Sequence, residues 1–278
     1  MKYQINGIAL EEYGVKTTPV NSSFGLSGIW DLPARGGKTF HNWGNENGIE
    51  PYVDYFDIWF LPRNITLNCS INESDGNLLK ARVDELFQAL QSNTENLLQL
   101  RVVDTGKIYR VYLSTEINVE YLKPGCADFA LQFIEPFPVI PTELPGEFGA
   151  NGGIDGIPFR ALGIAGITET KGLYSRPAIK ALQYTGEGGN KEFSGTKTEA
   201  KTIELSAAIK CQNLTDFGNK VDALQAVFSA PGLRKLKLII GYSADVFAAS
   251  GFTISNIYAV SGGIIADFKI KLYVVNED

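Results

Sequence analysis

The chain has 278 residues, of which 44% are hydrophobic, 20% charged and 11% aromatic, and its formal net charge is −6. This composition can supply a packed core, and it excludes disordered and collagen-like proteins. The acidic balance argues against binding nucleic acid through its phosphates and against docking on an anionic membrane, and no run of about 18 apolar residues predicts a transmembrane helix.

The first half of the chain predicts β-strands around a single helix. Residues 52–61 are rich in aromatic side chains, which favour a strand. From Ile65 to Ile71 apolar and polar residues alternate, as they do in a strand with one buried face. Residues 77–91 carry apolar side chains at helical spacing and predict an amphipathic helix. Further strands are predicted over residues 97–103, 108–114 and 127–134.

Residues 136–154 predict a linker between two domains. The segment contains four prolines and a cluster of glycines, a composition typical of connecting segments. We therefore expect one domain over residues 1–135 and a second over residues 155–278.

The second half repeats the apolar pattern of the first half. It predicts a helix over residues 214–229 and strands over residues 236–241, 246–249 and 264–275. An offset of 138 residues relates most matched positions, and an offset of 139 relates the last strand. The matches include Ile65 with Ile203, Leu67 with Leu205, Val83 with Val221, Leu86 with Leu224, Leu98 with Leu236 and Phe129 with Phe268. We interpret the repeat as a tandem duplication. It predicts a mainly β (α+β) protein with one helix per domain, built from two antiparallel β-sandwich or split-barrel domains.

Several short motifs of the first half resemble siphophage distal tail proteins. They are the run from Tyr3 to Val15, the loop from Leu32 to Gly37, the strand that begins at Arg63 and the helix with Val83 to Leu86. Their order resembles that of the family's ring-forming domain, which is itself similar to the tail-tube domain. The resemblance covers residues 1–135 and extends through the repeat to the second half. That half departs from the family, whose C-terminal module is commonly different and often suggests carbohydrate binding.

The resemblance implies a structural virion protein that is made in the bacterial cytoplasm and assembled at the distal tail or baseplate. It implies a ring that continues the tail-tube channel, either a homotrimer with pseudo-sixfold symmetry or a homohexamer. Neighbouring tail-tube and baseplate or hub proteins are the implied partners, and no membrane is expected among them. DNA would pass through the lumen without specific binding, and an acidic lumen would repel its phosphates.

The sequence predicts no catalytic, cofactor or metal site, and we expect a protein that is not an enzyme. His41 is the only histidine, so a catalytic triad or an ordinary zinc site lacks its usual members. The glycine-rich stretch over residues 185–192 fails the phosphate-binding-loop pattern, because Lys191 is followed by Glu192. The three cysteines lie far apart and are expected to be free thiols.

Two polar loops, over residues 31–50 and 184–197, are the predicted interaction surfaces. Loops on a rigid scaffold commonly carry contacts to partners. Trp30, Trp43 and Trp59 are candidate interface anchors; Trp43, in the first loop, is the favoured one, whereas Trp59 lies in a predicted strand and is expected in the core. The candidate contact residues are Arg35, Lys38, His41, Trp43, Glu187, Asn190 and Lys191.

The sequence leaves two alternatives open. The first is a major tail-tube subunit with a duplicated domain. The second is a carbohydrate-binding or carbohydrate-active protein, which acidic and aromatic residues would also serve, although no specific carboxylate pair can be identified.

Overall fold

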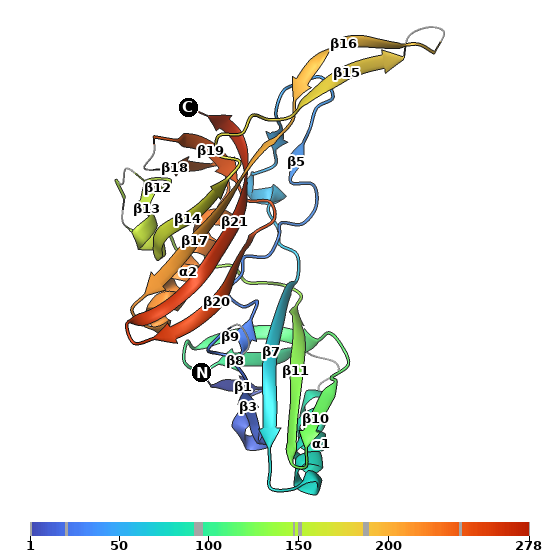
Figure 1. Cartoon of the computed structure of the whole chain (residues 1–278), viewed down its shortest axis with the longest axis vertical. Helices are drawn as coiled ribbons and strands as arrows, with labels where there is room; N and C mark the ends of the chain where they lie inside the picture. The colour runs from blue at the N-terminus through green and yellow to red at the C-terminus, as the bar shows by residue number, and fades with distance from the viewer. Residues whose placement is uncertain are drawn as a thin grey trace.

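The computed structural model describes residues 2–19, 22–91, 97–146, 148–149, 152–185, 189–238 and 241–277. Over these residues the strands form two large antiparallel sheets, and one α-helix packs against each sheet. Figure 1 shows the first sheet at the bottom, the second sheet above it and a two-stranded arm at the top. The predicted class, mainly β with one helix in each half, is confirmed.

The first sheet is built from the residues before the proline-rich segment. Its strands are β1 (Tyr3–Ile5), β2 (Ile8–Ala9), β3 (Val15–Thr17), β4 (Leu26–Ser27), β7 (Arg63–Asn72), β8 (Leu98–Val102), β9 (Lys107–Leu113), β10 (Val119–Lys123) and β11 (Cys126–Glu135). They lie in the order β2-β1-β8-β9-β11-β7-β3, and β4 also pairs with β7. β7 covers one edge of β11, while β10 and β9 share the other edge, so the sheet forks at β11.

The second sheet has the same strand order as the first. Its strands are β12 (Gly153–Ile154), β13 (Ile157–Pro158), β14 (Ile164–Lys171), β17 (Lys201–Cys211), β18 (Arg234–Lys237), β19 (Ser243–Phe247), β20 (Phe252–Val260) and β21 (Gly263–Glu277). They lie in the order β13-β12-β18-β19-β21-β17-β14. β20 and β19 share one edge of β21, so this sheet forks at the strand that corresponds to β11.

The two helices bury matching faces. α1 (Gly76–Gln91) and α2 (Leu214–Ser229) agree with the two predicted helices to within one residue. Asp75 accepts hydrogen bonds from the first backbone N–H groups of α1, and Asn213 caps α2 in the same way. The buried stripes are Leu79, Val83, Leu86 and Leu90 on α1, and Phe217, Val221, Leu224 and Phe228 on α2. Each member of the first stripe lies 138 positions before its counterpart.

The central strand pairs of the two sheets have the same register. Leu67 of β7 lies opposite Leu131 of β11, and Leu205 of β17 lies opposite Ile270 of β21. The offsets between these pairs are 138 and 139 residues, as in the sequence repeat. A slip of one residue would turn every buried side chain to the other face of the sheet. Because the register is the same in both sheets, equivalent positions are buried in the two halves.

Each sheet begins with a tight hairpin, and the second hairpin lies inside the predicted linker. Asn6-Gly7 and Asp155-Gly156 both have positive φ angles, near 50° and 80°, as a type I′ turn requires. Gly153 and Ile154 therefore belong to β12, and the predicted linker of residues 136–154 extends too far. The run from Asn6-Gly7-Ile8 to Gly14-Val15 returns as Asp155-Gly156-Ile157 to Gly163-Ile164, at an offset of 149.

The aromatic run over residues 52–61 does not form the predicted strand. It contains the short 3-10 helix η2 (Tyr55–Asp57), and Trp59 is 53% exposed, so its predicted place in the core is wrong. Its indole lies against Gly36, where a Cβ atom would come within 2.2 Å of the ring. Aromatic composition favoured a strand, but the run has no neighbouring strand along most of its length.

Candidate interaction site

Residues 28–61, which we call the crossing segment, leave the first sheet and pack on the second (Figure 1). The segment includes the small hairpin β5 (Phe40–His41) and β6 (Glu50–Pro51). It returns to the first sheet at β7. The boundary at residue 135 therefore divides the chain into two sheets, but residues of the first half pack on the second sheet.

The crossing segment pairs with the outer edge of β20. The backbones of Leu32 and Phe252 exchange two hydrogen bonds of 3.1 and 3.2 Å, and the N–H of Arg35 donates to the carbonyl of Ala249 at 2.9 Å. The N–H of Ile254 donates to the carboxylate of Asp31 at 2.7 Å. Through these bonds the first half covers a strand edge that would otherwise be open to association.

Trp30 anchors the crossing segment on α2. Its side chain is 1% exposed, and its ring meets the ring of Phe217 edge to face, with 5.1 Å between the centroids. The side-chain amide of Gln225 donates to the carbonyl of Asp31 at 3.0 Å. Lys107 of β9 forms an ion pair with Asp222 of α2 beside this contact.

Two acidic groups at the junction are largely removed from water. Burial raises the pKa of Asp31 to about 6, although the hydrogen bond from Ile254 and the charge of Arg63 oppose the shift. Burial also raises the pKa of Glu135, against the lowering effect of Arg63. Arg63 and Glu135 form a buried ion pair with 3.5 Å between Nε and Oε2.

Arg35 is the predicted contact residue that the structure places inside the molecule. Its side chain is buried and donates to the carbonyl of Tyr52, so it fixes the path of the crossing segment and is not an exposed contact. Burial lowers the pKa of this guanidinium, against the effect of Asp57. A charged side chain is rarely buried without a hydrogen-bond partner, and the sequence did not show that the carbonyl of Tyr52 is the partner of Arg35.

Lys38, His41 and Trp43 lie together on the β5–β6 hairpin. The rings of His41 and Trp43 are in contact, with 4.0 Å between the centroids, and Lys38 reaches His41. The indole N–H of Trp43 donates to Glu50 at 2.7 Å. Half of the Trp43 side chain is exposed, so this group of three can form a contact surface.

The second predicted loop is an extended arm, β15 (Ile179–Thr185) with β16 (Lys191–Thr198). It projects from the body of the molecule (Figure 1). Asn190 and Lys191 lie at its outer end, and Glu187 lies outside the described residues. At its inner end Lys197 donates to Asn42 and to the carbonyl of Trp43, at 2.8 and 2.7 Å. The two predicted loops therefore meet at the base of the arm.

A short sequence repeat lies where the crossing segment leaves the first sheet and where the segment leading to the β15–β16 arm leaves the second sheet. The sequence analysis did not identify this repeat. Residues 28–34 read Gly-Ile-Trp-Asp-Leu-Pro-Ala, and residues 172–178 read Gly-Leu-Tyr-Ser-Arg-Pro-Ala. The offset here is 144 residues, because the loops on either side differ in length. The constant offset of 138 residues therefore does not align the two copies, although they share a glycine, an aromatic residue, a proline and an alanine.

The two copies of this motif have the same local structure. Gly28 and Gly172 have φ angles of 87° and 78°, and a Cβ atom on either would collide with the backbone of the neighbouring central strand. The next residue's carbonyl accepts a bond from the cation that begins this strand: Arg63 donates to Ile29 at 3.1 Å, and Lys201 donates to Leu173 at 2.8 Å. Both segments therefore leave their sheets in the same way.

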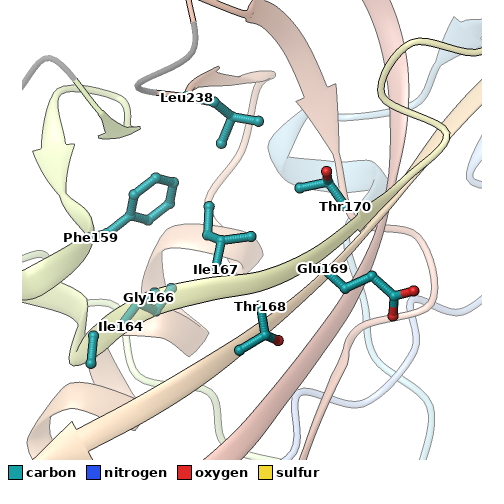
Figure 2. Close-up of a pocket in the computed structure, with 9 residues that line it drawn as sticks. Phe159, Ile164, Gly166, Ile167, Thr168, Glu169, Thr170 and Leu238 are labelled. Atoms are coloured by element: carbon teal, nitrogen blue, oxygen red, sulfur yellow. The ribbon is translucent and has the colours of Figure 1, made fainter.

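A hollow of about 410 Å³ lies beside β14. Figure 2 shows Phe159, Ile167 and Leu238 around it, while the carboxylate of Glu169 points away from them. Glu169 is the only ionisable side chain in its described lining, so no acid and base converge on the hollow.

The described residues form neither a cluster of metal ligands nor a membrane-spanning helix. No group of three or more His, Cys, Asp and Glu side chains in these ranges could hold a metal ion. In the same part of the chain, no helix is long and apolar enough to cross a membrane.

The chain was compared with protein families, curated proteins and solved structures, and a likeness was found among the solved structures. No protein-family model matches the sequence, and no curated protein matches it. Among solved structures, the chain is similar to the SPP1 Dit (gp 19.1) protein, described as a paradigm of the hub adsorption apparatus in phages that infect Gram-positive bacteria. The identity is 11% and the TM-score is 0.32, over 98% of this chain and 97% of that one.

Proposed function

We propose that this chain is a structural subunit of a phage tail that closes into a ring at the distal tail or baseplate and continues the tail-tube channel. The observation that carries the proposal is the contact between two halves of the same topology, in which the first half extends a segment over the second. A contact of this head-to-tail kind closes into a ring when its rotation permits, and it uses a different surface on each partner.

The sequence resemblance of residues 1–135 to the ring-forming domain of distal tail proteins supports the same proposal. In a trimer, the two halves of each chain would supply six similar wall segments around the channel. The arm, with Asn190 and Lys191 at its end, would remain for contacts with neighbouring tail-tube or hub proteins. Acidic residues outnumber basic ones in residues 1–135, whereas the two are equal in number over residues 136–278, and wall segments supplied by the first half would let DNA slide without binding.

The purified protein is expected to assemble as a closed ring. Mass photometry at micromolar concentration should give a species of three times the 30.4 kDa chain, or six times if only the first half forms the wall. Negative-stain images should show a central hole. Long tubes would favour the tail-tube alternative instead, and a strict monomer would refute the ring.

A further inference from the structure

We infer that residues 172–178 of one chain dock between α1 and β10 of a second copy of this chain. The inference rests on the proposed ring and names the residues that would join one chain to the next. Its template is the contact inside the chain, in which residues 28–34 dock between α2 and β20.

The two segments share the turn that presents their aromatic side chain. In each, the N–H of the residue after the aromatic donates to the glycine carbonyl at 3.3 Å, from Asp31 to Gly28 and from Ser175 to Gly172. The aromatic residues are Trp30 and Tyr174. Trp30 is 1% exposed, whereas Tyr174 is 79% exposed. A rigid turn therefore holds Tyr174 out of the surface, as an interface anchor requires.

The surface between a helix and the outer edge of the neighbouring strand is called the groove here, and in the first half the described chain leaves this surface, between α1 and β10, unpaired. In the template groove, Ile254 of β20 lies opposite Phe268, is 4% exposed, and donates its N–H to Asp31 of the crossing segment. In the first half, Val119 of β10 lies opposite Phe129 in the same register, but it is only half-buried. Within the described part of the chain, no strand pairs with the outer edge of β10. An open edge of this kind invites pairing with another chain.

The helix side of the groove also corresponds. Trp30 packs on Phe217 and lies beside Gly218, where a Cβ atom would be 4.0 Å from the indole. At the offset of 138 residues, the positions on α1 are Leu79 and Lys80, and Lys80 is exposed. A smaller aromatic ring, Tyr174, would leave room for the lysine side chain that replaces glycine.

Residues 172–178 and residues 28–34 differ in charge, and the difference matches the charges of the groove on which each would dock. Leu32 of the crossing segment corresponds to Arg176, which is exposed. The groove of the first half is flanked by Glu116 and Glu120, both exposed, where β20 is flanked by Gly251 and Ser255. An arginine facing two carboxylates gives complementary charge, which selects the partner and speeds the encounter.

The shape of the chain requires that the groove belong to another copy. In Figure 1, β14 runs from the body toward the arm, away from the first sheet. The residues that follow β14 therefore lead away from their own first half, which occupies the opposite end of the molecule. Repetition of the contact from chain to chain would alternate the two halves around the ring.

Tyr174→Ala should weaken association by about 30-fold or more, the effect of removing a central aromatic anchor. The measurement is mass photometry of the full chain over a dilution series. Because Tyr174 is exposed, the melting temperature of the dissociated chain should stay unchanged. The matched control is Tyr55→Ala. It removes another exposed tyrosine, which lies outside residues 172–178 and outside the groove of the first half, and it should leave the ring intact.

Cross-linking tests the geometry directly. With Cys126→Ser as background, a mixture of Y174C and K80C chains should give covalent dimers with a short bismaleimide, whereas Y55C and K80C chains should not. An intact ring in Tyr174→Ala together with no Y174C–K80C product would overturn the inference and leave the proposed ring standing. A monomeric wild-type chain would instead refute the proposed function.

Discussion

Arg63→Met should cost about 3–5 kcal/mol of folding stability, because it leaves a carboxylate buried without its cation. Arg63 begins β7 and Glu135 ends β11, directly opposite each other, and their side chains are 4% and 5% exposed. Arg63 also donates to the carbonyl of Ile29, so the variant loses a tie to the crossing segment. Urea denaturation of the variant and the wild type measures the loss.

The pH dependence of this loss has a definite sign. Burial already raises the pKa of Glu135, and Arg63 holds it down. Without the arginine the pKa rises further, so the buried carboxyl takes up a proton at low pH and the loss becomes smaller there. The double variant Arg63→Met with Glu135→Leu should recover most of the stability, and Arg101→Met, at an exposed arginine, should change little. A loss that is equal for Arg63→Met and Arg101→Met would contradict the argument.

The helices and the central strands could be predicted from the sequence, because their apolar periodicity records which face is buried. The stripe from Leu79 to Leu90 and the alternation from Ile65 to Ile71 need no knowledge of the partner surface. β10 and β20 are absent from the predicted elements. In β20 the pattern is interrupted by a register shift next to Asn256, which has a φ angle of 51°.

The contact between the halves could not be predicted, because periodicity does not say what a buried side chain packs against. Trp30 lies in a loop, and its burial depends on Phe217, which is far away in the sequence. Arginine is usually found at the protein surface, and only the fold brings Arg35 to the carbonyl of Tyr52. The repeat at residues 28–34 and 172–178 was the available signal, since it marks equivalent exits from two equivalent sheets.

Asp31→Asn should stabilise the protein above pH 6 by about 3 kcal/mol, at 1.36 kcal/mol for each unit by which the fold raises the pKa of this carboxyl to about 6. The shift from the ordinary value of 3.8 arises mainly from burial. Because the folded state holds the proton more tightly than the unfolded state, the stability due to Asp31 is complete below pH 3.8 and is lost as the pH rises through about 6. Asparagine keeps the acceptor for the N–H of Ile254 but carries no charge to bury.

The test is the difference in unfolding free energy between Asp31→Asn and the wild type, measured by urea denaturation from pH 4 to pH 8. Subtraction removes the contribution of the other carboxylates, and the difference should grow in favour of the variant between about pH 4 and 6 and then become constant. Asp54→Asn, at an exposed aspartate of the same segment, is the matched control for the exchange of the side chain itself. A flat difference for Asp31→Asn would contradict the argument, because it would mean that water reaches the carboxylate beside Trp30 and Gln225 and solvates the ion.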